Sequence, residues 1–210
     1  MVMLDRQLER AQNLNPSADT LASVDRGDVS VNVMGPLVIG QPASLHSSES
    51  EQAWQDFARM LSVMKAAGVD AITTDVWWGL VEPTDQGFDW RYYDRMSDAI
   101  IAAGLRWIPI LSFHQCGGNV GDDCSVPLPE WVWAKVARKA GVPNVDDVKY
   151  VSEQGNASPE YISAWATPFV TEDYGQLMHA FQKQFAAKKD HIAEINVSLG
   201  PAGELRYPSY

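Results

Sequence analysis

The chain has 210 residues, of which 46% are hydrophobic and eight are tryptophan, and this composition is typical of a folded globular protein with one sizeable core. Its net charge of -11 argues against nucleic acid or an anionic membrane surface as partner, and it is compatible with a neutral polymer or a small neutral ligand. No apolar run approaches the ~18 residues of a membrane-spanning helix, and residues 1–15 lack the apolar core of a secretory signal.

The pattern of the chain changes near residue 28. Residues 1–28 are polar and weakly periodic, so we expect a polar leader or a loosely attached segment there. From Val29 onward, short apolar runs alternate with amphipathic stretches, so residues 29–210 are expected to form one folded unit.

The first part of this unit predicts a strand, a helix and a second strand. The apolar run Val31–Ile39 predicts the first strand. Ser48 and Glu51 have the spacing of a capping box, and the helix that they open is expected to end at Gly68. The run Val69–Val76 then predicts the second strand.

The remaining elements repeat this alternation. Trp90–Ala103 predicts a second helix and Leu105–Phe113 a third strand. A long loop is expected over about residues 114–170, after which Thr171 is expected to cap a third helix. Ile192–Leu199 predicts a fourth strand.

The order β-α-β-α-β-α-β predicts a parallel α/β sheet with helical crossovers. Long loops after the strands suit a (β/α)8 TIM barrel, in which all such loops meet at one mouth. The chain would then form about the first half of the barrel, with strands 1–4, helices 1–3 and the long loop after strand 3. A doubly wound sheet is the competing topology, but no G-x-G-x-x-G motif follows the first strand.

Polar and aromatic residues follow the second, third and fourth strands. Asp75 precedes Trp77 and Trp78, His114 follows the third strand, and Glu204 lies in a Gly/Pro-broken turn after the fourth. An acid, a histidine and tryptophans at one barrel mouth suit a sugar ligand. Each residue also has a structural interpretation. Asp75 could cap a turn, His114 could be a hydrogen-bonded structural histidine, and Glu204 could be a solvated surface residue. Adjacent residues of a strand point opposite ways, so at least one of the two tryptophans is expected to lie in the core.

The two cysteines leave several alternatives open. Cys116 and Cys124 are separated by seven residues, three of them glycine, so they could form a disulfide or remain reduced thiols. Together with His114 they are too few and too mobile for a structural zinc site, and a Cys-His nucleophile pair has unfavourable spacing. A phosphate loop over Gly117–Gly121 is disfavoured by the net charge and by the lack of a following lysine.

Three motifs resemble the signatures of the β-amylases, glycoside hydrolase family 14. They are Asp75-Val-Trp-Trp-Gly79, Ser112–Asp122 and Gly200–Tyr210, and the resemblance covers roughly Val31–Tyr210. The spacing of the cysteines and the Val126-Pro-Leu-Pro sequence are more similar to the bacterial members.

The resemblance implies a (β/α)8 barrel that hydrolyses α-1,4-glucan from the non-reducing end and releases β-maltose with inversion. Glu204 matches the general acid that protonates the glycosidic oxygen. Asp75, His114 and Asp122 match residues that bind the glucose units beside the cleaved bond. In the bacterial members the pair matching Cys116 and Cys124 is disulfide-bonded, which implies secretion although no signal is visible.

The bacterial members also hold a calcium ion away from the active site. Glu82, Asp85, Asp173 and Gln176 fall near the matching positions. Gln176 stands where a carboxylate is expected, and the loop around Asp85 looks one residue shorter. Oxygen ligands from two loops could still bind calcium, more weakly because of the lost charge.

The residues that match the family include one of its two catalytic carboxylates. An inverting glycosidase needs two carboxylates, and in this family the second lies far downstream of the Glu204 motif. We therefore expect the isolated chain to carry the acid without the base and to be inactive alone. Its first and fourth strands would have open edges, so we also expect marginal stability, or association with a second copy or with the missing half.

Two other hypotheses compete with half of a β-amylase. The chain could be a noncatalytic half-barrel that binds glucan or a protein partner, which would show no maltose release. It could also be a different barrel glycosidase, which would act on a substrate other than α-1,4-glucan.

Overall fold

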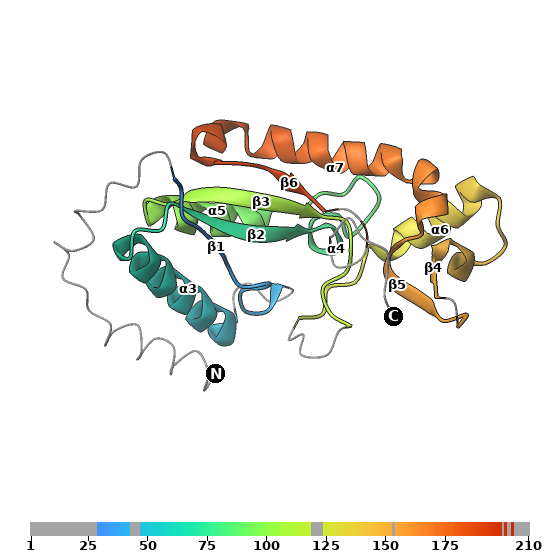
Figure 1. The fold of residues 1–210 in the computed structure, drawn as a ribbon, viewed down its shortest axis with the longest axis horizontal. Coiled ribbons are helices and arrows are strands. Elements are labelled where there is room, and N and C mark those ends of the chain that lie inside the picture. Colours follow the sequence, from blue (N-terminus) through green and yellow to red (C-terminus); the bar gives the residue numbers. More distant parts are fainter. Residues whose placement is uncertain are drawn as a thin grey trace.

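The computed structural model describes residues 29–42, 47–118, 124–152, 154–198, 200 and 203 (Figure 1). The leader expected over residues 1–28 lies outside these ranges. The strands of the main sheet are β1 (Asn32–Met34), β2 (Ala71–Trp77), β3 (Arg106–Ser112) and β6 (Asn196–Val197).

The main sheet is parallel, and its strand order β1-β2-β3-β6 follows the chain. A doubly wound sheet reverses its order at a switch point, whereas a barrel adds each strand beside the previous one. The described strands therefore have the topology of part of a (β/α)8 barrel. The register places Asp75 beside Ile110 and Trp77 beside Ser112, so β2 and β3 end together.

Three long helices connect the strands: α3 (Ser48–Ala66), α5 (Arg91–Ala102) and α7 (Thr171–Gln184). Figure 1 shows α3 near the β1 edge of the sheet and α7 beside the β6 edge, and both helices contribute to the same hydrophobic core. The predicted caps are each wrong by one residue. Ser47, in an extended conformation, is the N-cap of α3 and accepts from the Ser50 amide, while Val170 is the N-cap of α7. The Thr171 hydroxyl instead donates to the Thr167 carbonyl.

The two outer strands are shorter than predicted. β1 ends at Met34, before Gly35 and Pro36, because proline has no amide hydrogen to extend the ladder. At the other edge, among the residues that the structure describes, Asn196–Val197 pair with β3 and a single bridge joins Ile192 to Trp107.

The segment predicted as a long loop after β3 contains secondary structure of its own. It forms α6 (Glu130–Ala140), the short helices η2 (Val145–Val148) and η3 (Ala164–Phe169), and an antiparallel hairpin of β4 (Lys149–Val151) and β5 (Ala157–Ile162). A short helix that was not predicted, α4 (Trp78–Val81), directly follows β2, and the short helix η4 (Ala186–His191) follows α7. The segment is therefore a small folded excursion at the carboxyl end of the sheet.

The strand alternation separates a core face from a polar face. Ile72 and Val76 of β2 and Trp107 and Leu111 of β3 belong to the core that the long helices cover. Side chains one residue along each strand point the other way. That second face carries the polar groups described below.

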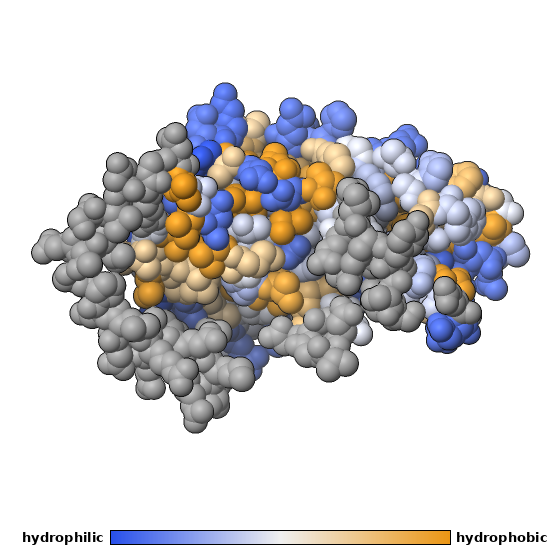
Figure 2. All heavy atoms as spheres, in the orientation of Figure 1, coloured by the Kyte–Doolittle hydropathy of each residue, from blue (hydrophilic) through white to orange (hydrophobic). Residues whose placement is uncertain are grey.

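Apolar side chains remain exposed near the sheet edges. Met34 of β1 and Val197 of β6 are 47% and 41% exposed, and Figure 2 shows hydrophobic atoms gathered over the sheet. Edge strands with exposed apolar residues are surfaces that proteins normally cover. No helix in the described ranges is both long and apolar enough to cross a membrane.

Candidate active site

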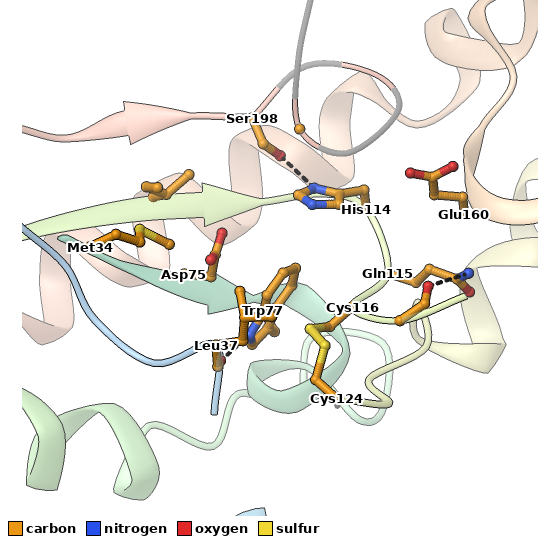
Figure 3. Close-up of a pocket in the computed structure, with 13 residues that line it drawn as sticks. Met34, Leu37, Asp75, Trp77, His114, Gln115, Cys116, Cys124, Glu160 and Ser198 are labelled. Carbon is orange, nitrogen blue, oxygen red and sulfur yellow. Dashed lines mark hydrogen bonds between the residues drawn. A yellow bond between two sulfur atoms is a disulfide. The ribbon is translucent and has the colours of Figure 1, made fainter. Parts of the chain in front are cut away.

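A cavity of about 310 Å³ lies at the carboxyl ends of β2, β3 and β6 (Figure 3). Asp75 and Trp77 come from β2, His114 follows β3, Ser198 follows β6, and Glu160 comes from β5. Loops at this end of parallel strands carry the active site in (β/α)8 enzymes. Two of the predicted sugar-binding residues, Asp75 and His114, are therefore brought to one cavity.

Asp75 is a buried carboxylate on the face of β2 opposite the helical core. The Ser112 hydroxyl on β3 donates to its Oδ1 at 2.6 Å. Burial raises the pKa of Asp75 above its ordinary 3.8, and the Ser112 hydrogen bond acts in the opposite direction. The carboxylate is thus fixed in position while it lines the cavity.

His114 is held from its Nδ1 side by Ser198. The Ser198 hydroxyl oxygen lies 3.3 Å from Nδ1 and also accepts from the Phe113 amide at 2.8 Å. The serine hydrogen is therefore free to point at Nδ1, which would place the ring proton on Nε2. Burial lowers the pKa of His114, and the charge of Glu160 raises it in part. A neutral imidazole that donates from Nε2 suits a sugar hydroxyl.

Trp77 ends β2 and Trp78 begins α4, and the two adjacent side chains point to opposite sides of the sheet, as predicted. Trp77 lines the cavity, donates from its indole nitrogen to the Leu37 carbonyl at 2.8 Å, and contacts the His114 ring edge-on. Trp78 lies in the core and donates from its indole nitrogen to Glu82 at 2.7 Å. Of the two tryptophans, Trp77 is therefore the one that faces the cavity.

Cys116 and Cys124 form a disulfide at the rim of the cavity. This pairing confirms one of the alternatives and removes the zinc and thiol-nucleophile alternatives, since both sulfurs are bonded to each other. Two backbone hydrogen bonds between Cys116 and Val126 support the bridge. At Gly117, with φ +98°, a Cβ would lie 2.3 Å from the Cys124 carbonyl oxygen, so only glycine fits.

Glu160 is a cavity residue that the sequence did not reveal. β5 brings it there, because the Glu160 carbonyl accepts from the Gln115 amide at 2.8 Å. Glu160 is only 5% exposed. The one local signal is an acid placed directly before an apolar Tyr-Ile pair, which by itself indicates a solvated strand residue.

The predicted acid Glu204 and the predicted sugar ligand Asp122 lie outside the described residues. The preceding residue, Gly203, does line the cavity. A Cβ on Gly203 would lie 2.8 Å from Cε1 of His114, so the backbone packs directly against the imidazole. The roles of Glu204 and Asp122 stay predictions.

The four residues predicted to bind calcium come from two segments: Glu82 and Asp85 follow α4, and Asp173 and Gln176 belong to α7. Glu82 is buried and accepts from Trp78 and from the Gln86 amide at 2.8 Å. Burial raises the pKa of Glu82, and the charges of Asp85 and Asp173 add to this. Gln176 lies three residues after Asp173 on α7, hence on the same helix face. Calcium binding itself stays a prediction.

The fold defines this chain as part of a (β/α)8-barrel protein, and its cavity lies at the carboxyl ends of the strands. The chain belongs to glycosyl hydrolase family 14, whose family model matches residues 32–210. The resemblance seen in the sequence motifs is thereby confirmed.

Several relatives agree with this assignment. The beta-amylase of Niallia circulans is 44% identical over 185 residues, which are 88% of this chain and 29% of that protein. The beta-amylase of Cytobacillus firmus is 40% identical over 212 residues, covering 100% of this chain and 41% of that protein. The crystal structure of the catalytic domain of a beta-amylase from Paenibacillus polymyxa matches with a TM-score of 0.71 and 42% identity, over 86% of this chain and 39% of that one. The chain thus spans less than half the length of these relatives.

The charge of Glu160 should be measurable at His114. In Glu160→Gln the carboxylate that raises the histidine pKa is lost while burial still lowers it, so the pKa of His114 is expected to fall further. NMR titration of the imidazole signals, assigned with His114→Gln, measures this. Glu172→Gln, an exposed carboxylate on α7, is the control. An unchanged His114 titration in Glu160→Gln would show that the two groups do not interact.

Proposed function

We propose that the protein to which this chain belongs hydrolyses α-1,4-glucosidic bonds of starch-type glucans from the non-reducing end and releases β-maltose with inversion. The observation that carries this proposal is the placement of Asp75 and His114, with Trp77 between them and the disulfide, in one cavity at the barrel mouth. Membership of family 14 and the names of the relatives support it.

The side chains suit the roles that the family resemblance assigns. A buried carboxylate such as Asp75 accepts hydrogen bonds from sugar hydroxyls, and a neutral His114 can donate one. Trp77 offers an aromatic surface for the apolar C–H groups of a glucose ring. We assign the proton transfer to the glycosidic oxygen to Glu204 and an additional sugar contact to Asp122.

The second carboxylate of the inverting pair is not assigned to any of the 210 residues. Asp75 and Asp122 are assigned to sugar binding, and Glu160, the other carboxylate among the described residues that line the cavity, is given no role in proton transfer. An inverting enzyme needs its base about 6.5–9.5 Å from the acid, on the opposite face of the sugar. We propose that residues outside this sequence supply it and that further barrel strands cover the exposed edges of β1 and β6.

Export into an oxidising compartment is part of this proposal. Disulfides persist in secreted proteins and are rare in the reducing cytosol. The bridge between Cys116 and Cys124 and the bacterial relatives support it.

Binding of malto-oligosaccharides by the 210-residue chain tests the cavity. Calorimetry should detect saturable binding of maltotetraose and none of cellotetraose, whose linkages are β-1,4. Asp75→Asn should weaken binding by about 10- to 100-fold, because a hydrogen bond to a charged group contributes about 1.5–3 kcal/mol. Asp98→Asn, an exposed acid on α5, should bind like the unaltered chain. Equal affinity in Asp75→Asn and Asp98→Asn would contradict the assignment.

The same substitution should stabilise the fold at neutral pH. The pKa of Asp75 is raised in the folded chain, so ionising it costs stability as the pH rises through the folded value. Asparagine carries no such cost. Asp75→Asn should therefore unfold at higher urea concentration than the unaltered chain at pH 8, and the difference should shrink towards pH 4. A gain that instead grew towards pH 4 would contradict this sign.

An assay of β-maltose release distinguishes glucan binding by this chain from glucan hydrolysis. We expect the 210-residue chain to bind maltotetraose without hydrolysing it. Robust maltose release that Glu204→Gln abolishes would contradict the claim that the second carboxylate lies outside these residues. It would at the same time support Glu204 as the acid.

A further inference from the structure

Lys135 lies between Asp85 and Asp173, two of the four residues to which the family resemblance assigns a calcium ion. Its ammonium nitrogen lies 2.8 Å from Oδ1 of Asp85 and 2.7 Å from Oδ1 of Asp173. Asp173 is fully buried, and the lysine side chain is only 14% exposed. The three residues belong to three separate segments: the turn after α4, helix α6 and helix α7.

The donor set does not fit a calcium ion. Calcium takes about six to eight oxygen ligands at roughly 2.3–2.6 Å. An ion that bridged the same oxygens of Asp85 and Asp173 would take the position of the Lys135 nitrogen. Within the described ranges, no group of three or more acidic, histidine or cysteine side chains is placed to hold a metal.

The other oxygens of the cluster are largely engaged. Both oxygens of Glu82 accept hydrogen bonds, from the Trp78 indole and the Gln86 amide. Two buried oxygens among the described residues lack a hydrogen-bond partner, Oδ2 of Asp173 and Oε1 of Gln176. Of these two oxygens, only Oδ2 of Asp173 belongs to a charged group, and the Lys139 ammonium nitrogen lies 3.7 Å from it. Two such oxygens beside two lysines do not make a divalent-cation site.

We propose that Lys135 takes the place of the metal ion and that this chain holds the site together without calcium. A protein ammonium supplies one positive charge to a buried carboxylate, and its three donors can bridge acids from different segments. The ammonium ties α6 to α7 and to the turn after α4. Since α6 begins the excursion that carries Glu160, the tie also steadies one wall of the cavity.

Thermal unfolding in calcium and in EDTA tests the proposal on the full 210-residue chain. The unaltered chain should have the same Tm in 5 mM calcium chloride and in EDTA. Lys135→Gln should lower the Tm in EDTA by about 5 °C or more, because it leaves buried Asp173 without its closest cation. Calcium should then restore part of the loss. Lys149→Gln, which removes a surface ion pair with exposed Asp146, is the matched control and should change the Tm little.

Terbium luminescence gives a second readout that does not depend on stability. Tb³⁺ is a calcium mimic that emits when a nearby tryptophan is excited, and the Trp131 ring lies 4.9 Å from the Lys135 nitrogen. The unaltered chain should give no terbium emission that added calcium abolishes by displacing the terbium ion. A calcium-dependent Tm, saturable calcium binding by calorimetry or displaceable terbium emission in the unaltered chain would overturn the proposal. A Lys135→Gln variant no less stable than Lys149→Gln would overturn it as well.

Discussion

Replacing Trp78 by alanine is expected to lower the free energy of unfolding by about 3–5 kcal/mol, as for other buried aromatic residues. Trp78 is fully buried, and its ring contacts Phe113, Trp131 and Tyr174 edge-on. These three rings come from the end of β3, from α6 and from α7. The truncation would therefore leave a cavity where the sheet, the excursion and the third long helix meet.

The indole nitrogen adds a second cost. It donates to the buried carboxylate of Glu82, and an unpaired buried charge is expensive. Trp78→Phe keeps most of the ring packing but loses this donor, so it should cost less than Trp78→Ala and more than a surface substitution.

Urea unfolding followed by circular dichroism measures both losses. Trp165→Ala is the control, because that ring is half exposed and its removal should change the midpoint little. A midpoint for Trp78→Ala equal to that of the control would show that this junction contributes nothing to stability.

Reducing the disulfide is expected to destabilise the chain by about 2–3 kcal/mol. The bridge joins residues eight positions apart, and the chain-entropy relation for a loop of this length gives that value. The effect should reach the cavity, because Trp77 packs in one apolar cluster with Cys116, Cys124 and Val126. The backbone hydrogen bonds between Cys116 and Val126 remain after reduction, so the loss should be partial.

Unfolding with and without a reducing agent measures this contribution. The double variant Cys116→Ser/Cys124→Ser should match the reduced chain and should not respond to the reductant. If reductant shifts the midpoint of the double variant as much as that of the unaltered chain, the effect does not come from the bridge.

The local pattern of the sequence was sufficient to predict the four strands and the three long helices. Apolar periodicity reports which face of a helix or strand is buried, and Leu177 and Phe181, four residues apart on α7, are both buried. Strand ends and caps depend on single residues and backbone angles. For this reason two predicted boundaries differ from the structure, in which β1 ends before Gly35 and Ser47 is the N-cap of α3.

The excursion between β3 and α7 was the main failure of the sequence interpretation. Its helix and hairpin are short, and their burial comes from packing against distant elements rather than from a long periodic pattern. The sequence analysis consequently did not single out Glu160, which β5 brings to the cavity through the hydrogen bond between its carbonyl and the Gln115 amide.

The sequence by itself determined the family, the parallel α/β order and the pair Asp75 and His114. It could do so because parallel strands place the residues at their carboxyl ends at one edge. Only the tertiary structure decided that Glu160 joins them and that Lys135 sits between Asp85 and Asp173, 50 and 38 residues away. Contacts at such separation depend on how whole segments fold back, and no local pattern encodes them.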